Sequence, residues 1–213
     1  MSTIPSKQEM YQALCDRIGA EKQQMLERAV VAIAGLGGLG SNIAYMLARA
    51  GVGRLILVDF DKVDITNLNR QQYKANQIEL FKTDALSENL KEIAPYINLT
   101  AHATKLDESS TKELLKDADI ICEAFDNAEA KAMLAETVLT QMKDKYLVAA
   151  SGMAGLGSAN SITTRRLSEK FILCGDGRSD VNDGIGLVSS RVTLCAAHQA
   201  HAVIRLILGM KEE

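Results

Sequence analysis

Glycines and an acidic residue occupy positions early in the chain that suit nucleotide binding. The cluster "GLGGLG", with glycines at Gly35, Gly37, Gly38 and Gly40, follows an apolar run, and such glycines let phosphate oxygens approach N–H groups at a helix N-terminus. Asp59 ends the next apolar run, about twenty residues later, where a carboxylate that accepts ribose hydroxyls is usually found. Taken alone, the glycines could form a purely structural tight turn, and Asp59 could be a solvated residue at a strand end. Together they favour a nucleotide, without choosing between NAD and ATP.

A second group of polar residues favours ATP. Arg70 offers a planar fork suited to phosphate, Asn67 and Gln71 can hydrogen-bond phosphate oxygens, and Lys82 could add a positive charge. Asp126 follows the apolar stretch "DIICEAF" and could hold Mg²⁺. Alternatively, Arg70 could brace its loop, Lys82 could be solvated and Asp126 could cap a helix. Two cations with a metal-binding acid suit attack on the α-phosphate of ATP better than hydride transfer.

Length and composition exclude several classes of protein. The 213 residues, 47% of them hydrophobic, are enough for one compact domain, residues 1–213. A net charge of −3 and the absence of a basic cluster disfavour a nucleic-acid partner. No apolar run reaches the roughly 18 residues of a membrane span, and the N-terminus is not a signal peptide, so we expect a cytoplasmic protein. The four cysteines form no C-x-x-C pair, which predicts reduced thiols and no zinc.

Apolar stretches alternate with helical patterns along residues 30–150. We predict strands in "AVVAIAG", "RLILVDF", "NLTAHAT", "DIICEAF" and "KYLVAAS", and helices over about 38–49, 76–93, a serine-capped 108–118 and 127–144. This order predicts an α/β fold, a Rossmann-like, mostly parallel sheet with helices on both faces. One or two helices over 7–28 precede it. Residues 151–213 depart from the alternation and predict a hairpin, a polar loop over 175–186 and a C-terminal helix.

The motifs together resemble the nucleotide site of the ThiF-type adenylyltransferases, which include molybdopterin-synthase adenylyltransferase and the ubiquitin-activating enzymes. The resemblance rests on "GLGGLGSN", "ILVDFDKVDITNLNRQQY", "ELFKTDAL" and "EAFDN", and "ASGMAGLGSAN" extends it toward short ThiF proteins that act on the sulfur carrier ThiS in thiamine synthesis. It implies a homodimer that uses ATP and Mg²⁺ to convert the C-terminal Gly-Gly carboxylate of a ubiquitin-like sulfur carrier into an acyl adenylate, releasing pyrophosphate. The implied nucleotide site comprises Gly35, Gly37, Gly38, Gly40, Asp59, Asp61, Asn67, Arg70, Gln71, Lys82 and Asn127, with Asp126 on Mg²⁺.

Three features of the sequence limit what the resemblance implies. The two C-x-x-C pairs that hold zinc in larger relatives are missing. Arg17 is a candidate for the N-terminal arginine that many relatives place in a partner's active site, although it could lie on a solvated helix face. Cys174 starts the predicted crossover loop over 175–186 and could take up sulfur or the acyl group if it is exposed; an inert strand-end thiol is the alternative.

His198 and His201 lack a third ligand and are expected to be structural.

Other functions share parts of this pattern. An NAD(P)-dependent oxidoreductase would explain the glycines and Asp59 but leave Arg70, Gln71 and Asp126 without a role. A non-catalytic nucleotide sensor would keep the pocket without turnover. Within the family, the activated carboxylate could belong to a small molecule or to a tRNA, although the acidic balance disfavours tRNA.

Overall fold

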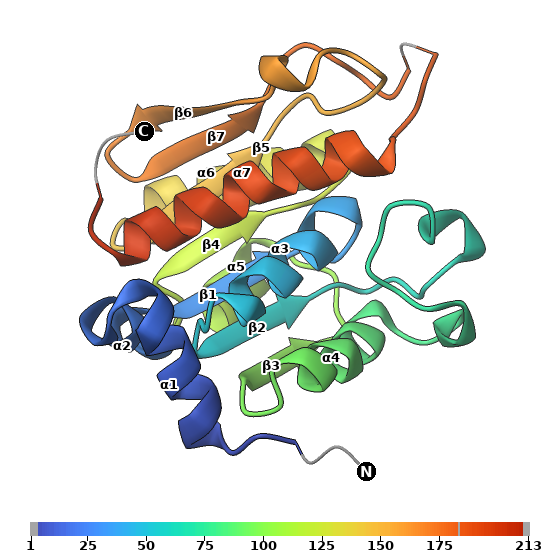
Figure 1. The fold of residues 1–213 in the computed structure, drawn as a ribbon. Coiled ribbons are helices and arrows are strands. Elements are labelled where there is room, and N and C mark those ends of the chain that lie inside the picture. The colour runs from blue at the N-terminus through green and yellow to red at the C-terminus, as the bar shows by residue number, and fades with distance from the viewer. Residues whose placement is uncertain (1–3, 183, 211–213) are drawn as a thin grey trace.

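One seven-stranded sheet organises the protein (Figure 1). The computed structural model describes residues 4–182 and 184–210. The strands are β1 (Val30–Ala34), β2 (Arg54–Val58), β3 (Asn98–His102), β4 (Ile120–Glu123), β5 (Tyr146–Ala150), β6 (Thr163–Ser168) and β7 (Phe171–Gly175). Their order is β3-β2-β1-β4-β5-β7-β6, and all neighbours are parallel except the β6–β7 hairpin. The predicted α/β fold with a mostly parallel sheet is therefore confirmed.

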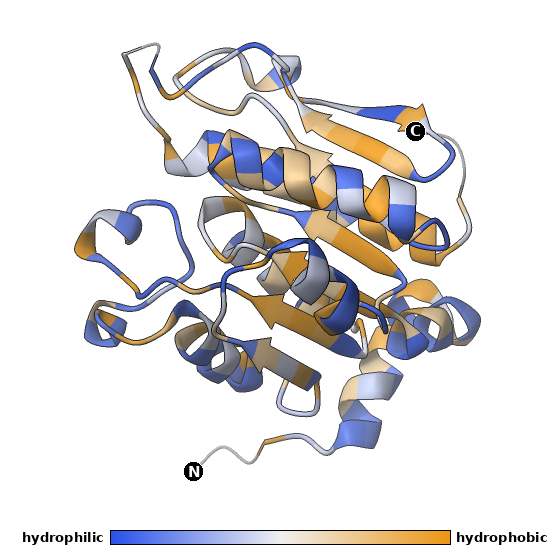
Figure 2. Cartoon of the chain, turned by 180° about the vertical axis from the view of Figure 1, so that it is seen from behind, coloured by the Kyte–Doolittle hydropathy of each residue, from blue (hydrophilic) through white to orange (hydrophobic). Residues whose placement is uncertain are grey.

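Helices cover both faces of this sheet. Side chains of a strand alternate between its faces, so Ile33 of β1 packs in one core with Ile43 of α3, while Ala34 packs in the other with Leu134 of α6. The first face carries α2 (Ala20–Arg28), α3 (Gly38–Arg49), α4 (Lys82–Ile93) and α7 (Ser189–Ile207); the second carries α5 (Glu108–Leu114) and α6 (Ala128–Gln141). Because both faces are buried, the central strands are hydrophobic along most of their length (Figure 2). The remaining helix, α1 (Lys7–Ile18), packs beside α2.

Two predicted helix starts were wrong. The helix expected from residue 76 begins at Lys82, because Glu79 has a φ of 71°, a left-handed conformation that an α-helix cannot contain. A short 3-10 helix, Ala75–Gln77, precedes it. The cap of α5 is Asp107, not a serine: its carboxylate accepts a hydrogen bond of 2.7 Å from the N–H of Ser110.

The loops that carry the predicted site leave the carboxyl edge of the sheet. Residues 60–81 follow β2, and residues 176–182 follow β7, so both loops project from the same edge, at the right in Figure 1. At this edge β1 lies between β2 and β4, where the strand order reverses. Such a reversal opens a crevice for ligands in parallel α/β sheets. In the described part of the chain, no helix has the length and apolar character that crossing a membrane requires.

Candidate nucleotide site

The glycine turn between β1 and α3 uses its glycines in two ways. A Cβ on Gly35 would lie 2.7 Å from the carbonyl oxygen of Ala124, and one on Gly40 would collide with the carbonyl oxygen of Gly35, so these two glycines permit close backbone packing. A Cβ on Gly37 would meet nothing closer than the Gln71 amide nitrogen, at 3.8 Å. No side chain caps the N-terminus of α3. Gly37 thus leaves room beside uncapped helix N–H groups, as phosphate binding requires.

Asp59 connects this turn to the end of β2. Its side chain is buried, and its Oδ2 accepts a hydrogen bond of 2.6 Å from the N–H of Leu36 while its Oδ1 accepts one of 2.8 Å from the N–H of Asp61. Burial raises the pKa of Asp59 above its ordinary value, and the positive charge of Lys82 opposes this shift. Each carboxylate oxygen keeps a further lone pair for a ligand.

Lys82 belongs to the same cluster. Its side chain is buried, and its Nζ lies 2.8 Å from Oδ2 of Asp61, whose own side chain is half exposed. The alternative of a solvated lysine is therefore wrong. The structure brings Asp59, Asp61 and Lys82 together at the first turn of α4, where Lys82 pairs with Asp61 and its charge also acts on Asp59.

The loop "NLNRQQY" is fastened to α3. Asn42 donates a hydrogen bond of 3.1 Å to the carbonyl oxygen of Arg70 and accepts one of 2.8 Å from the Gln72 amide, while the Tyr73 hydroxyl donates one of 2.7 Å to the carbonyl oxygen of Leu36. Sequence reasoning missed Asn42 as a functional residue. Its signal was a polar residue within an otherwise apolar helix, "NIAYMLA". These bonds hold Arg70 and Gln71 next to the glycine turn.

Polar atoms within this loop lack partners. The Arg70 Nη1 donates to the carbonyl oxygen of Thr66 at 3.0 Å and to Oδ1 of Asn69 at 2.9 Å, so Arg70 does brace its loop. Nevertheless, the Arg70 Nε and the Gln71 Oε1 are buried without a hydrogen-bond partner among the described residues. Asn67 differs, because its Oδ1 already accepts a hydrogen bond of 3.1 Å from the N–H of Asp64. Unpartnered buried polar atoms are costly unless a ligand or water satisfies them.

Asp126 lies at the same edge, after β4. The cap of α6 is its neighbour Asn127, whose Oδ1 accepts a hydrogen bond of 2.9 Å from the N–H of Ala130, so the capping alternative for Asp126 is wrong. Asp126 is exposed. Within residues 4–182 and 184–210 no group of three or more His, Cys, Asp or Glu side chains could hold a metal ion. Mg²⁺ at Asp126 would thus need phosphate oxygens as additional ligands, which is a common arrangement.

A buried ion pair supports the backbone that carries Asp126. Both oxygens of Glu123 lie 2.9 Å from Nζ of Lys131, and Oε1 accepts a hydrogen bond of 2.7 Å from the N–H of Phe125. The Glu123 side chain is 2% exposed. Burial raises the pKa of Glu123, and Lys131 opposes the shift. Sequence reasoning missed this pair, although a glutamate at the end of a buried strand was a visible signal.

The remaining sequence candidates lie away from this cluster. Arg17 is exposed at the opposite end of the sheet, where it lines a groove of about 520 Å³ with Lys22, Arg49 and Leu208 among others. Cys174 is fully buried at the end of β7, and its Sγ lies 3.8 Å from the hydroxyl of Thr164. The exposure expected of a reactive Cys174 thiol is therefore missing. Its side chain alternates onto the same core face as Ile172.

All four thiols should resist modification in the folded protein. Cys15, Cys122, Cys174 and Cys195 are all buried, and burial raises the pKa of Cys195 to about 12. We expect iodoacetamide at pH 8 to alkylate none of them on the timescale in which it alkylates the urea-unfolded protein completely. Mass spectrometry of the digested protein gives the site. Rapid labelling of Cys174 under native conditions would contradict its placement here.

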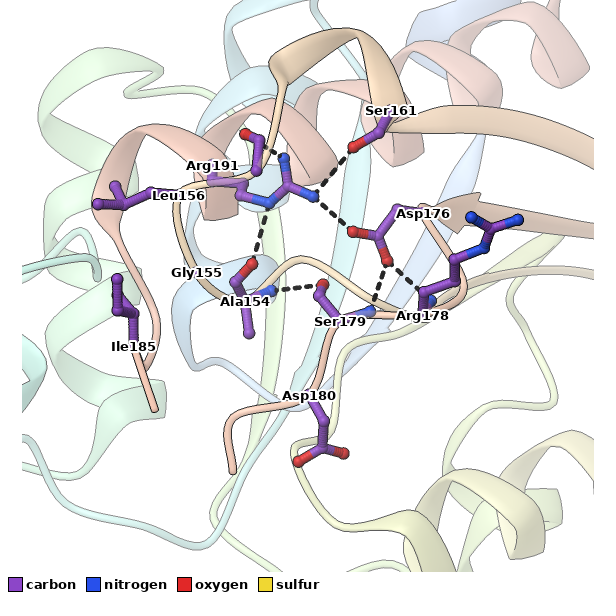
Figure 3. Close-up of a pocket in the computed structure, with 11 residues that line it drawn as sticks. Ala154, Gly155, Leu156, Ser161, Asp176, Arg178, Ser179, Asp180, Ile185 and Arg191 are labelled. Atoms are coloured by element: carbon purple, nitrogen blue, oxygen red, sulfur yellow. Dashed lines mark hydrogen bonds and ion pairs between the residues drawn. The ribbon is translucent and has the colours of Figure 1, made fainter. Parts of the chain in front are cut away.

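A cavity of about 580 Å³ opens near the carboxyl ends of β5 and β7 (Figure 3). Segment 154–157 forms one wall and residues 176–180 with Ile185 another, with Arg191 of α7 between them. The N–H of Gly155 donates a hydrogen bond of 3.0 Å to the carbonyl oxygen of Gly186, which links segment 154–157 to the end of the loop before α7. The predicted crossover loop lies here. Sequence reasoning did not anticipate Arg191.

Known proteins are similar to this chain in sequence or in fold. "Adenylyltransferase and sulfurtransferase MOCS3" of Culex quinquefasciatus is 29% identical over 93% of the chain and 46% of its own length, and its Caenorhabditis briggsae counterpart is 36% identical over 58% of the chain and 31% of its own length. The chain thus spans less than half of these relatives. Escherichia coli tRNA N6-threonylcarbamoyladenosine dehydratase, TcdA, solved in complex with ATP, superposes with a TM-score of 0.85 at 18% identity, over 97% of this chain and 98% of its own.

The family assignment follows from the length of the match. The ThiF family matches residues 11–213, which include every strand of the sheet and both edge loops. The same stretch contains the glycine turn, the Asp59–Lys82 cluster and the cavity at Arg191. The chain therefore belongs to the ThiF family.

Proposed function

We propose that this protein is an ATP-dependent adenylyltransferase that activates a carboxylate as an acyl adenylate and releases pyrophosphate. The observation that carries this proposal is the convergence on one sheet edge of an open Gly37, a buried Asp59 and two cations, Arg70 and Lys82. A hydride-transfer enzyme would need only the first two of these features. The relatives named adenylyltransferases support the same chemistry.

Each residue has a role that its geometry supports. Asp59 accepts the ribose hydroxyls, and the N-terminus of α3 with the Arg70 Nε receives the phosphates. Lys82 stabilises negative charge that develops on the phosphates during attack. Asp126 holds Mg²⁺, which when bound supplies charge neutralisation for the pyrophosphate leaving group. Because a carboxylate and a triphosphate repel each other, these preorganised charges lower the barrier.

The acceptor we propose is the C-terminal Gly-Gly of a ubiquitin-like sulfur carrier, as in thiamine synthesis. An extended glycine tail is narrow enough for the cavity between segments 154–157 and 176–180, beside the sheet edge where Asp126 lies. Its terminal carboxylate oxygen attacks the α-phosphorus, and the bond to the bridging oxygen of pyrophosphate breaks. In a homodimer, Arg17 would act on the partner subunit, because it is exposed and far from the site of its own chain.

Pyrophosphate exchange tests this function. We expect the protein to exchange labelled pyrophosphate into ATP only with Mg²⁺ and a carrier ending in Gly-Gly, and not with the same carrier lacking its last glycine. Exchange supported by a tRNA or a small carboxylate instead would keep the enzyme class and replace the acceptor. Binding of NADH without any binding of ATP would overturn the proposal in favour of an oxidoreductase.

Replacing Asp59 by alanine should weaken ATP binding by about 1.5–3 kcal/mol, the range for hydrogen bonds to a charged group. The same change also removes the acceptor for the Leu36 N–H, so the ribose contact needs a separate readout. We expect the native protein to bind ATP more tightly than 2′,3′-dideoxy-ATP, and Asp59→Ala to bind the two equally, by calorimetry. If native protein already binds both with one affinity, Asp59 does not contact the ribose.

A further inference from the structure

One buried arginine joins the two walls of the cavity. Arg191, in the first turn of α7, is only 6% exposed, and all three of its guanidinium nitrogens donate hydrogen bonds (Figure 3). The acceptors are the carbonyl oxygens of Ala154 (3.0 Å), Gly157 (2.8 Å) and Ser158 (2.7 Å), the hydroxyl of Ser161 (3.1 Å) and the carboxylate of Asp176. Three separate stretches of chain, 154–161, 176 and α7, therefore meet at this side chain.

Asp176 extends this contact into the loop. While Oδ2 pairs with Arg191, Oδ1 accepts hydrogen bonds of 2.8 Å from the N–H of Arg178 and 2.9 Å from the N–H of Ser179. Burial alone would raise the pKa of Asp176, but these bonds lower it to about 2, so the carboxylate is ionised near neutral pH. A Cβ on Gly152 would collide with this carboxylate, which explains a glycine there.

We propose that Arg191, acting with Asp176, is a positioning residue that sets the distance between the cavity walls and thereby the affinity for the acceptor. This inference rests on the proposed function. Arg191 has no free donor for a ligand, because each guanidinium nitrogen is already hydrogen-bonded to the walls, so it acts through them. The Asp59–Lys82 cluster makes none of these contacts, so we expect ATP affinity to be independent of Arg191.

Trypsin reports the order of the loop without reference to activity. Arg178 is the only basic residue between Lys170 and Arg191, and the peptide bond after it contains the Ser179 N–H that Asp176 holds. A protease needs this bond extended and free. We expect Arg191→Met and Asp176→Asn to be cleaved after Arg178 at least tenfold faster than native protein. Arg205→Met, the same change in the last turn of the same helix, should not be.

Kinetics separate a positioning role from a structural one. In pyrophosphate exchange with the Gly-Gly carrier, both variants should show a KM for the carrier raised at least tenfold and a Kd for ATP changed less than twofold. Arg191→Lys should not rescue the carrier KM, because an ammonium cannot reproduce the planar fork. Arg205→Met should keep both native values.

The outcomes distinguish this inference from the proposed function. Native cleavage rates in both variants, or an unchanged carrier KM despite faster cleavage, would overturn the positioning role. Native protein that shows no exchange with any carrier would instead overturn the proposed function, whatever the cleavage rates. Should Arg191→Met fail to fold, Asp176→Asn decides alone, because its Oδ1 can still accept from the N–H groups of Arg178 and Ser179 and the change removes only the charge that pairs with Arg191.

Discussion

Replacing Arg70 or Lys82 by alanine should slow adenylation by a factor of about 10² or more, the cost of removing one charged contact from reacting phosphates. The effect on kcat should exceed the effect on ATP affinity, because negative charge on the phosphates grows during the attack. Lys82 should be the more sensitive position, since its Nζ is the cation beside both Asp59 and Asp61. Single-turnover formation of the acyl adenylate measures the step directly.

Two matched variants serve as controls for this prediction. Lys62→Ala removes an exposed lysine of the same loop, and Arg49→Ala removes an exposed arginine at the other end of α3. Both should adenylate at the native rate. Circular dichroism must show the fold intact in all four proteins. Native rates in both Arg70→Ala and Lys82→Ala would remove the catalytic assignment of this loop, whereas equal losses in the controls would point to a general effect of charge.

Lys131→Met should produce the largest loss of stability, about 3 kcal/mol in the free energy of unfolding. The change leaves the Glu123 carboxylate, 2% exposed, without its counter-ion, and breaking a buried pair costs about 3–5 kcal/mol. Lys131 is itself 29% exposed, which places the estimate at the lower end. Urea unfolding followed by circular dichroism measures it. Lys112→Met is the control, because it breaks an exposed pair with Glu108 and should cost much less stability than Lys131→Met.

The deficit of Lys131→Met should shrink as pH falls. Without Lys131 the pKa of Glu123 rises further above its unfolded value, so the folded variant binds a proton that the unfolded chain does not. A carboxyl group whose pKa is higher in the folded state than in the unfolded chain stabilises the folded state as pH falls. This gain develops as pH falls through the folded pKa toward the unfolded pKa of about 4.3. Glu123→Gln/Lys131→Met should recover most of the loss at pH 7. A deficit equal to that of Lys112→Met would show that the pair contributes little.

The alternation of apolar runs and helical patterns was sufficient to predict the sheet, because each crossover is local in sequence. The start of α4 could not be predicted, since it depends on the left-handed Glu79, a residue that rarely adopts this conformation. Cys174 should have been predicted as buried: it lies two residues from Ile172 on a strand, so both side chains face the same core. Its strand-end position beside a loop had left both an exposed and an inert thiol open.

Contacts between distant segments account for what the sequence could not show. Spacing placed Asp59 correctly at the end of β2, because the distance from a glycine turn to the next strand end is fixed by one helix. No spacing rule connects Asn42 with the backbone of Arg70, or Arg191 with Asp176 and Ser158. Such partners are set by how α3 and α7 pack, which only the folded chain determines.

The chain order of the two halves of the site has a consequence for how proteins of this family can diversify. The glycine turn, Asp59, Lys82 and Asp126 all precede α6, whereas the cavity walls and Arg191 all follow β5. The two groups meet across the parallel pairing of β4 and β5 and where α7 packs on α3. A single crossover in the gene near residue 145 that keeps the face of α7 packed on α3 would therefore exchange one cavity for another while the half proposed to handle ATP is inherited intact. Recombination, rather than many point substitutions, becomes the short route to a new acceptor.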